Sequence, residues 1–146
     1  MLAAGYDRPV RRLVVAICAL GATAGAAHGA IVSFRMPSGN IYCAELTGAR
    51  ATLRCDIRSG VKPLPPKPAS CQFDWGAGFT MGRRGRARVS CVSDSVYNPS
   101  ARVLRYGTTW RRDGFVCVSR PAGLRCRNAS GHGFFLSRRR SYARLP

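Results

Sequence analysis

The sequence contains few acidic residues and almost no histidine or lysine. Its 146 residues include six Asp and Glu and two His, and lysine occurs only at positions 62 and 67. It has no Cys-X-X-Cys pair, no EF-hand loop and no phosphate-binding loop. A zinc site needs about four nitrogen or sulfur ligands. We therefore expect no metal and no cofactor in this protein.

Sustained helical periodicity is also missing. Short apolar runs alternate with turn-forming residues, which is typical of an all-β domain. We predict a small disulfide-stapled sandwich or barrel-like domain of short antiparallel strands and hairpins. The predicted strands are 31–36, 41–44, 51–57, 73–76, 79–81, 87–92, 103–106, 115–119, 123–127 and 134–136. Residues 61–70 hold four prolines and are expected to form an extended surface connection.

The first 29 residues have the layout of a secretory signal peptide. Arginines at positions 8, 11 and 12 precede an uncharged apolar run, and small residues flank His28 before the expected cleavage point. The alternative is a retained anchor, because the uncharged stretch 13–34 reaches the ~20 residues that span a bilayer. With cleavage, residues 30–146 form one domain that is secreted or lies in the periplasm or cell envelope.

Arginine dominates the charged residues. The formal net charge is +18, and it is +16 without the leader, which holds three arginines and one aspartate. A field of this sign attracts polyanions and anionic surfaces, although a bias toward arginine codons would give the same composition. The candidate anion-binding residues are Arg83 and Arg84, Arg111 and Arg112, and Arg138, Arg139 and Arg140. Asp113-Gly114 predicts a hairpin turn that includes Trp110, which stands beside the second pair, and a tryptophan in a turn can be an exposed anchor.

Two cysteine-containing segments repeat one pattern. In residues 40–55 and 114–126, an apolar pair precedes a cysteine, a turn follows, and Leu-Arg-Cys ends the unit, with Ser-Gly at the same distance beyond it. Duplication or convergence explains the repeat. Each copy predicts a hairpin, and antiparallel neighbours lie close enough at Cα for a disulfide. The expected pairs are Cys43 with Cys55, Cys117 with Cys126 and, by elimination, Cys71 with Cys91. Pairing between the copies is the alternative, since six cysteines allow about 15 pairings.

His132 is the one catalytic candidate. It stands between two glycines, which leave an imidazole accessible for general-base chemistry, and a hydrolase would need a serine and Asp74 or Asp94 nearby. In the alternative, which we favour, the glycines serve a turn and the ring bonds to the backbone. We assign no catalytic residue, and expect Asp56 and Asp74 to pair with arginines.

An ordered set of motifs resembles a known bacterial domain of unknown function found in small secreted, cysteine-containing proteins. The motifs lie between and beside the six cysteines and are Pro37-Ser38-Gly39-Asn40, Asp56-Ile57, Asp74-Trp75-Gly76, Leu104-Arg105-Tyr106-Gly107, Gly131-His132-Gly133-Phe134 and Leu136-Ser137-Arg138. Met36 replaces a usual serine. The resemblance implies secretion and a single disulfide-bearing domain, and it implies no activity.

These features predict a monomeric secreted protein that binds rather than catalyses. The expected partner is an anionic envelope polymer, a membrane surface or an unidentified protein. The alternatives are a hydrolase that uses His132 and an extracellular binder of nucleic acid or another polyanion. Arginines beside aromatic rings suit single-stranded nucleic acid. However, no recognised nucleic-acid motif is present, so we expect no nucleic-acid partner.

Overall fold

The computed structural model describes residues 29–144, and the chain within them forms eleven β-strands and no helix. The predicted leader lies outside the described residues except for Gly29. Among residues 29–144, no helix is long and apolar enough to cross a membrane.

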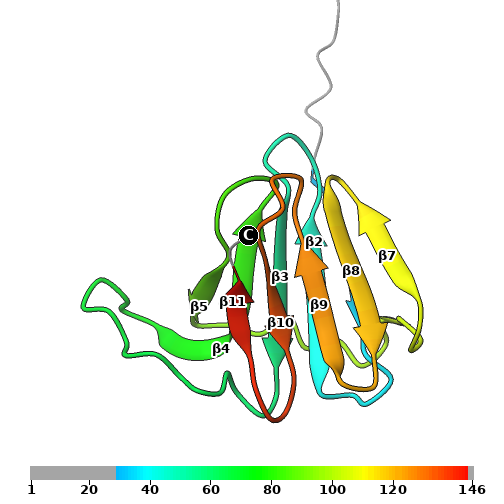
Figure 1. The fold of residues 1–146 in the computed structure, drawn as a ribbon. Helices are drawn as coiled ribbons and strands as arrows, with labels where there is room; N and C mark the ends of the chain where they lie inside the picture. Colours follow the sequence, from blue (N-terminus) through cyan, green and yellow to red (C-terminus); the bar gives the residue numbers. More distant parts are fainter. Residues whose placement is uncertain (1–28, 145–146) are drawn as a thin grey trace, which may run out of the picture.

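The strands form two sheets that face each other as a sandwich (Figure 1). The first sheet has the order β5-β4-β3-β2-β1-β6, with β6 parallel to β1 and the other neighbours antiparallel. The second is antiparallel throughout, in the order β11-β10-β9-β8-β7. The strands are β1 Ile31–Arg35, β2 Ile41–Leu46, β3 Thr52–Ile57, β4 Asp74–Gly82, β5 Arg88–Val92, β6 Arg102–Val103, β7 Thr109–Arg112, β8 Phe115–Arg120, β9 Gly123–Arg127, β10 Gly133–Leu136 and β11 Tyr142–Arg144.

The core lies between the sheets and is built from alternate residues of the central strands. Phe79 of β4 stacks on Phe134 of β10 with 5.5 Å between ring centroids, and this contact joins the two sheets. Leu53 and Leu124 have no exposed surface. Burial of such side chains is the main favourable term in folding.

The disulfides follow the predicted pairing. Cys43–Cys55 joins directly opposed residues of β2 and β3, and Cys117–Cys126 does the same for β8 and β9. These four cysteines are fully buried in the core. Cys71–Cys91 ties the proline-rich connection, which projects from the sandwich (Figure 1), to β5.

The two repeated segments are the central hairpins of the two sheets. The Ser-Gly that follows each copy also plays the same part, because it closes a turn after the second strand of the hairpin. The Gly60 N–H donates to the Ile57 carbonyl at 2.9 Å, and the Gly131 N–H donates to the Asn128 carbonyl at 3.0 Å. Both glycines have positive φ, which other residues rarely adopt.

Several predicted boundaries were wrong for physical reasons. Segments 73–76 and 79–81 belong to one strand, β4. They were predicted separately because a bulge between Trp75 and Phe79 interrupts the alternation of side chains. The strand predicted at 103–106 is shortened to Arg102–Val103. Strand β11 was missed because it has no apolar alternation, and it adds to the β10 edge through its backbone.

Candidate anion-binding groove

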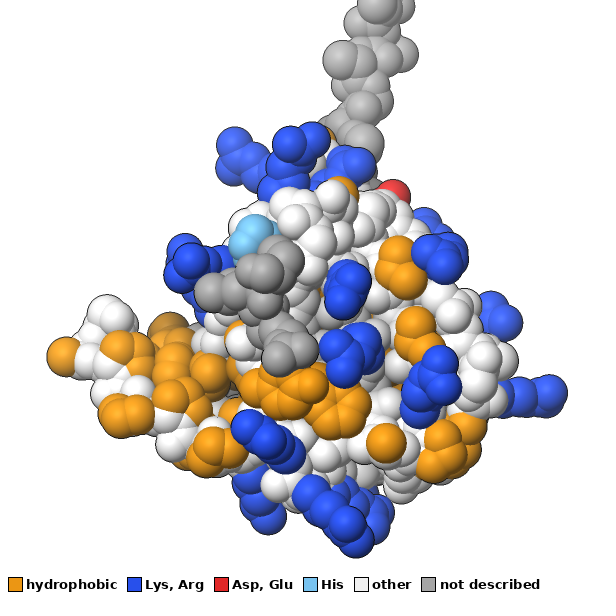
Figure 2. Space-filling model, viewed as in Figure 1, with side chains coloured by type: hydrophobic (Ala, Val, Ile, Leu, Met, Phe, Trp, Pro, Cys, Tyr) orange, Lys and Arg blue, Asp and Glu red, His pale blue; other side chains and the backbone are white. Residues whose placement is uncertain are grey.

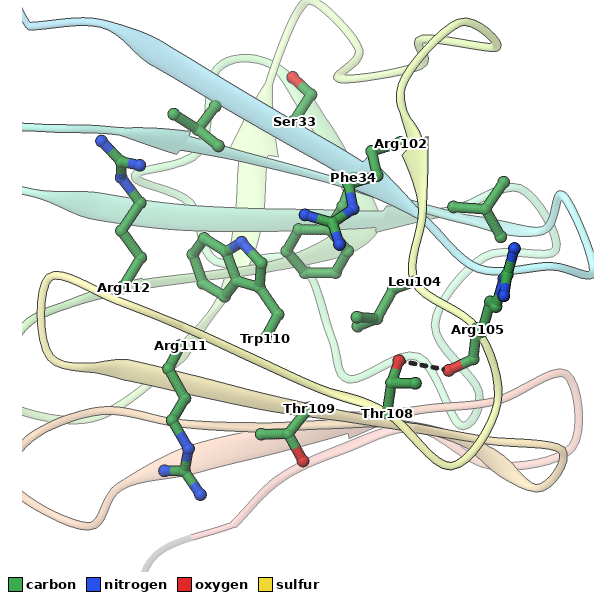
Figure 3. Close-up of a pocket in the computed structure, with 12 residues that line it drawn as sticks. Ser33, Phe34, Arg102, Leu104, Arg105, Thr108, Thr109, Trp110, Arg111 and Arg112 are labelled. Carbon is green, nitrogen blue, oxygen red and sulfur yellow. Dashed lines mark hydrogen bonds between the residues drawn. The ribbon is translucent and has the colours of Figure 1, made fainter.

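A groove of about 1050 Å³ opens between the edges of the two sheets, with β1 and β6 on one side and β7 on the other (Figure 3). We call it the β1–β7 groove. Its volume lies slightly above the range of ~300–1,000 Å³ typical of ligand pockets. Its lining residues are Val32, Ser33, Phe34, Arg102, Val103, Leu104, Arg105, Thr108, Thr109, Trp110, Arg111 and Arg112.

The groove exists because both sheets end here in short edge strands. β7 is the last strand of the second sheet, and β6 contributes only two residues, which pair with Phe34 and Arg35 of β1. Side chains alternate along β7, so Trp110 and Arg112 point toward the first sheet while Thr109 and Arg111 point away (Figure 3).

Trp110 and Phe34 form the apolar floor. Their ring centroids lie 4.9 Å apart, and Trp110 is half-buried while Phe34 is buried. Trp110 lies in β7, so the prediction that it lies in a turn was wrong. The Asp-Gly turn does form at Asp113 and Gly114, and Trp110 precedes it in the strand.

Four exposed arginines line the groove, namely Arg102, Arg105, Arg111 and Arg112, of which Arg111 extends from the face of β7 opposite to that of Trp110. The sequence analysis proposed Arg111 and Arg112 as anion-binding residues but did not include Arg102, which the parallel pairing of β6 places beside Phe34. A guanidinium presents a planar set of donors that matches carboxylate or phosphate oxygens, and it also stacks on aromatic faces. The groove therefore combines an aromatic floor with donors for anionic groups.

A buried carboxyl lies behind one of these arginines. Glu45 faces inward on β2, in line with Ile41 and Cys43, and its side chain has no exposed surface. The Arg112 Nε lies 3.3 Å from Oε2, but neither carboxyl oxygen has a hydrogen-bond partner of good geometry. Burial, reinforced by Asp113 and opposed by Arg112, raises the pKa of Glu45 to about 7. Glu45 is therefore only partly ionised near pH 7, so its carboxylate offsets the positive charge of the groove only in part.

The other predicted arginines lie elsewhere, and Figure 2 shows basic side chains spread widely over the visible face. Arg83 and Arg84 are in the β4–β5 turn and border a hollow of about 660 Å³. Arg138 and Arg139 are in the β10–β11 connection and border another hollow of about 470 Å³. Arg140, in the same connection, lies 5.8 Å from the Tyr142 ring centroid.

His132 belongs to a hydrogen-bond network that joins loops of the two sheets. Its Nδ1 lies 2.9 Å from Ser130 Oγ, which also bonds to Asn128 Oδ1 and accepts the Gly85 N–H. The Asn128 amide donates to the carbonyls of Gly82 and Gly85. Within residues 29–144 no acidic side chain forms an ion pair with His132, so the structure places a serine beside it but no carboxylate.

The scarce carboxylates outside the groove were expected to pair with arginines. Arg54 donates to both oxygens of Asp56 at 2.9 and 2.7 Å and to Asp94 Oδ1 at 2.6 Å. The hydrogen bond and the charge of Arg54 lower the pKa of Asp94. The expectation is thus confirmed for Asp56. Asp74 is exposed and forms no ion pair within the part of the chain that the structure describes.

A search of the same part of the chain for three or more His, Cys, Asp or Glu side chains that could together hold a metal ion finds none.

The model of a family of unknown function, DUF6636, matches residues 12–143. No curated protein matches the chain, and no solved structure does. Because the match covers nearly the whole sequence, the chain belongs to the DUF6636 family, whose function is unknown.

Proposed function

We propose that this protein is a secreted, non-catalytic module that binds an anionic macromolecule at the cell envelope or outside the cell, through the β1–β7 groove. The three disulfides support the location, because such bonds persist in oxidising extracellular or periplasmic compartments.

One observation carries the proposal: four exposed arginines line the groove beside the half-buried Trp110, and the carboxyl behind Arg112 is only partly ionised at pH 7. Arginines of this kind bind phosphate or carboxylate groups, and a Trp face adds contact area and cation–π attraction. The hydrolase alternative has less support, because Ser130 Oγ beside His132 is already engaged by Asn128 and Gly85.

The test compares two variants that each lose three positive charges. In the groove variant, Arg102, Arg105 and Arg111 become Gln, which spares the Arg112–Glu45 contact. In the control, Arg138, Arg139 and Arg140 become Gln. Binding of fluorescent inorganic polyphosphate to oxidised residues 30–146 is measured at about 50 and about 200 mM salt. If about four charges are neutralised, the wild-type affinity should fall about 50-fold between these salt concentrations.

We expect the groove variant to lose at least about ten-fold more affinity than the control at low salt. Equal losses of affinity in the two variants would show that net charge alone causes binding, without a specific site. An affinity that is the same at both salt concentrations would overturn the polyanion assignment. The same variants tested with anionic vesicles and single-stranded nucleic acid distinguish a membrane surface or nucleic acid from a soluble polymer.

A further inference from the structure

We infer that the β1–β7 groove takes an extended acidic polypeptide segment, whose backbone pairs with the free edge of β7. This inference rests on the proposed function, since it assumes that the groove is the anion-binding site, and it names the class of partner.

The first support is the unpaired edge itself. The Ser119 N–H donates to the Thr108 carbonyl at 3.0 Å, which fixes the alternation of the β7–β8 ladder. Trp110 and Arg112 therefore direct their backbone groups toward β8, and Thr109 and Arg111 direct theirs outward. All four β7 residues line the groove although their side chains point to opposite faces, so the strand edge itself borders the cavity.

The second support is that the opposite wall leaves room for a chain. β6 covers β1 only at Phe34 and Arg35, so within residues 29–144 no strand pairs with residues 31–33 on that side. An exposed edge with unsatisfied N–H and C=O groups is a template for strand addition. A polysaccharide or polyphosphate has no donors and acceptors at strand spacing, so a polypeptide matches the edge better.

The third support is the chemistry of the two faces that an added strand would meet. Its side chains would alternate, with one set over Trp110 and Phe34 and the other toward Arg111. Arg102 and Arg105 stand across the groove on the β6 side. The site thus fits a segment in which apolar residues alternate with Asp or Glu, whose carboxylates bind the guanidinium groups.

The experiment uses oxidised residues 30–146 and three probes. They are a capped peptide of about eight alternating Glu and Val residues, the same peptide N-methylated at alternate positions, and inorganic polyphosphate. N-methylation removes the pairing donors and keeps the charge. On the protein side, Thr109→Pro removes one edge N–H and keeps every arginine, and proline is tolerated on edge strands. Its control is Ala143→Pro on β11, the opposite edge of the same sheet, where the register also directs the N–H outward.

We expect N-methylation and Thr109→Pro each to weaken peptide binding about ten-fold or more, and Ala143→Pro to leave it unchanged. If polyphosphate binds the groove but the peptide does not, or if N-methylation has no effect, the inference fails and the proposed function stands. If replacement of Arg102, Arg105 and Arg111 by Gln weakens the binding of none of the three probes, both the inference and the proposed function fail. The N-methylated peptide keeps the test decisive if Thr109→Pro does not fold.

Discussion

Replacement of Glu45 by glutamine is expected to stabilise the protein at neutral and alkaline pH and to leave it nearly unchanged in acid. Glu45 has no exposed surface, and burial raises its pKa from 4.5 to about 7, with Asp113 adding to the shift. The folded protein therefore holds this proton more tightly than the unfolded chain. The free energy of unfolding falls as pH rises from 4.5 to about 7, and this contribution is constant above that range.

The magnitude follows from the pKa difference. Each pH unit between 4.5 and about 7 costs about 1.4 kcal/mol, so ionisation of Glu45 destabilises the folded state by about 3 kcal/mol at pH 8. The attraction of Arg112 is already included in the raised pKa. Glutamine has the shape of the neutral carboxyl and does not ionise, so the variant should escape this cost.

The assay is urea unfolding of the oxidised protein and the Glu45→Gln variant between about pH 4 and about pH 8. The stability difference between them should grow by about 3 kcal/mol in favour of the variant over this range. Asp94→Asn serves as the control. Arg54 lowers the pKa of Asp94 below its ordinary value of 3.8, so this variant should differ from wild type by a nearly constant amount above about pH 5. A constant difference for Glu45→Gln, or a variant less stable than wild type at pH 8, would refute the reasoning, because it would mean that the Arg112 ion pair outweighs the cost of burial.

Three further predictions concern stability. Asn128→Ala should cost about 1–3 kcal/mol in thermal unfolding, because it leaves two carbonyls of the β4–β5 turn without their donor, and a cost below about 0.5 kcal/mol would contradict the bridging role. Replacement of Cys71 and Cys91 by Ala should lower stability by about 2–4 kcal/mol and admit protease to the proline-rich connection; equal cleavage with and without the bridge would argue against the tether. Gly78→Ala should lower the free energy of unfolding by about 2–3 kcal/mol in thermal unfolding, because a Cβ there would overlap a β3 carbonyl. Gly82→Ala on the same strand has room for a Cβ and should lower it by less than about 1 kcal/mol.

The features that the sequence predicted well are local in the chain. Each hairpin disulfide joins cysteines in adjacent strands, so periodicity and turn chemistry were enough to place Cys43 opposite Cys55 and Cys117 opposite Cys126. The Asp-Gly turn at Asp113 was found for the same reason, and its positive φ values match the residue types.

The groove depends on contacts between distant segments, and sequence patterns do not contain them. Arg102 reaches the site because a two-residue strand pairs in parallel with β1. Trp110 was assigned to the turn that begins three residues later, because a short edge strand has too few residues to show alternation. Glu45 occupies an inward position of β2, but its pKa is raised mainly by burial between the sheets, and Asp113 raises it further while Arg112 lowers it, both from the β7–β8 hairpin.

Binding through the β1–β7 groove is tested most directly by locating where a polyanion contacts the protein. Backbone and arginine Nε NMR shifts of ¹⁵N-labelled residues 30–146, titrated with short-chain inorganic polyphosphate at low salt, locate that contact. We predict that the largest shifts cluster at Ser33, Arg102 to Arg105 and Thr108 to Arg112. Shifts centred on Arg138 to Arg140, or spread evenly over all the arginines, would contradict the groove as the binding site.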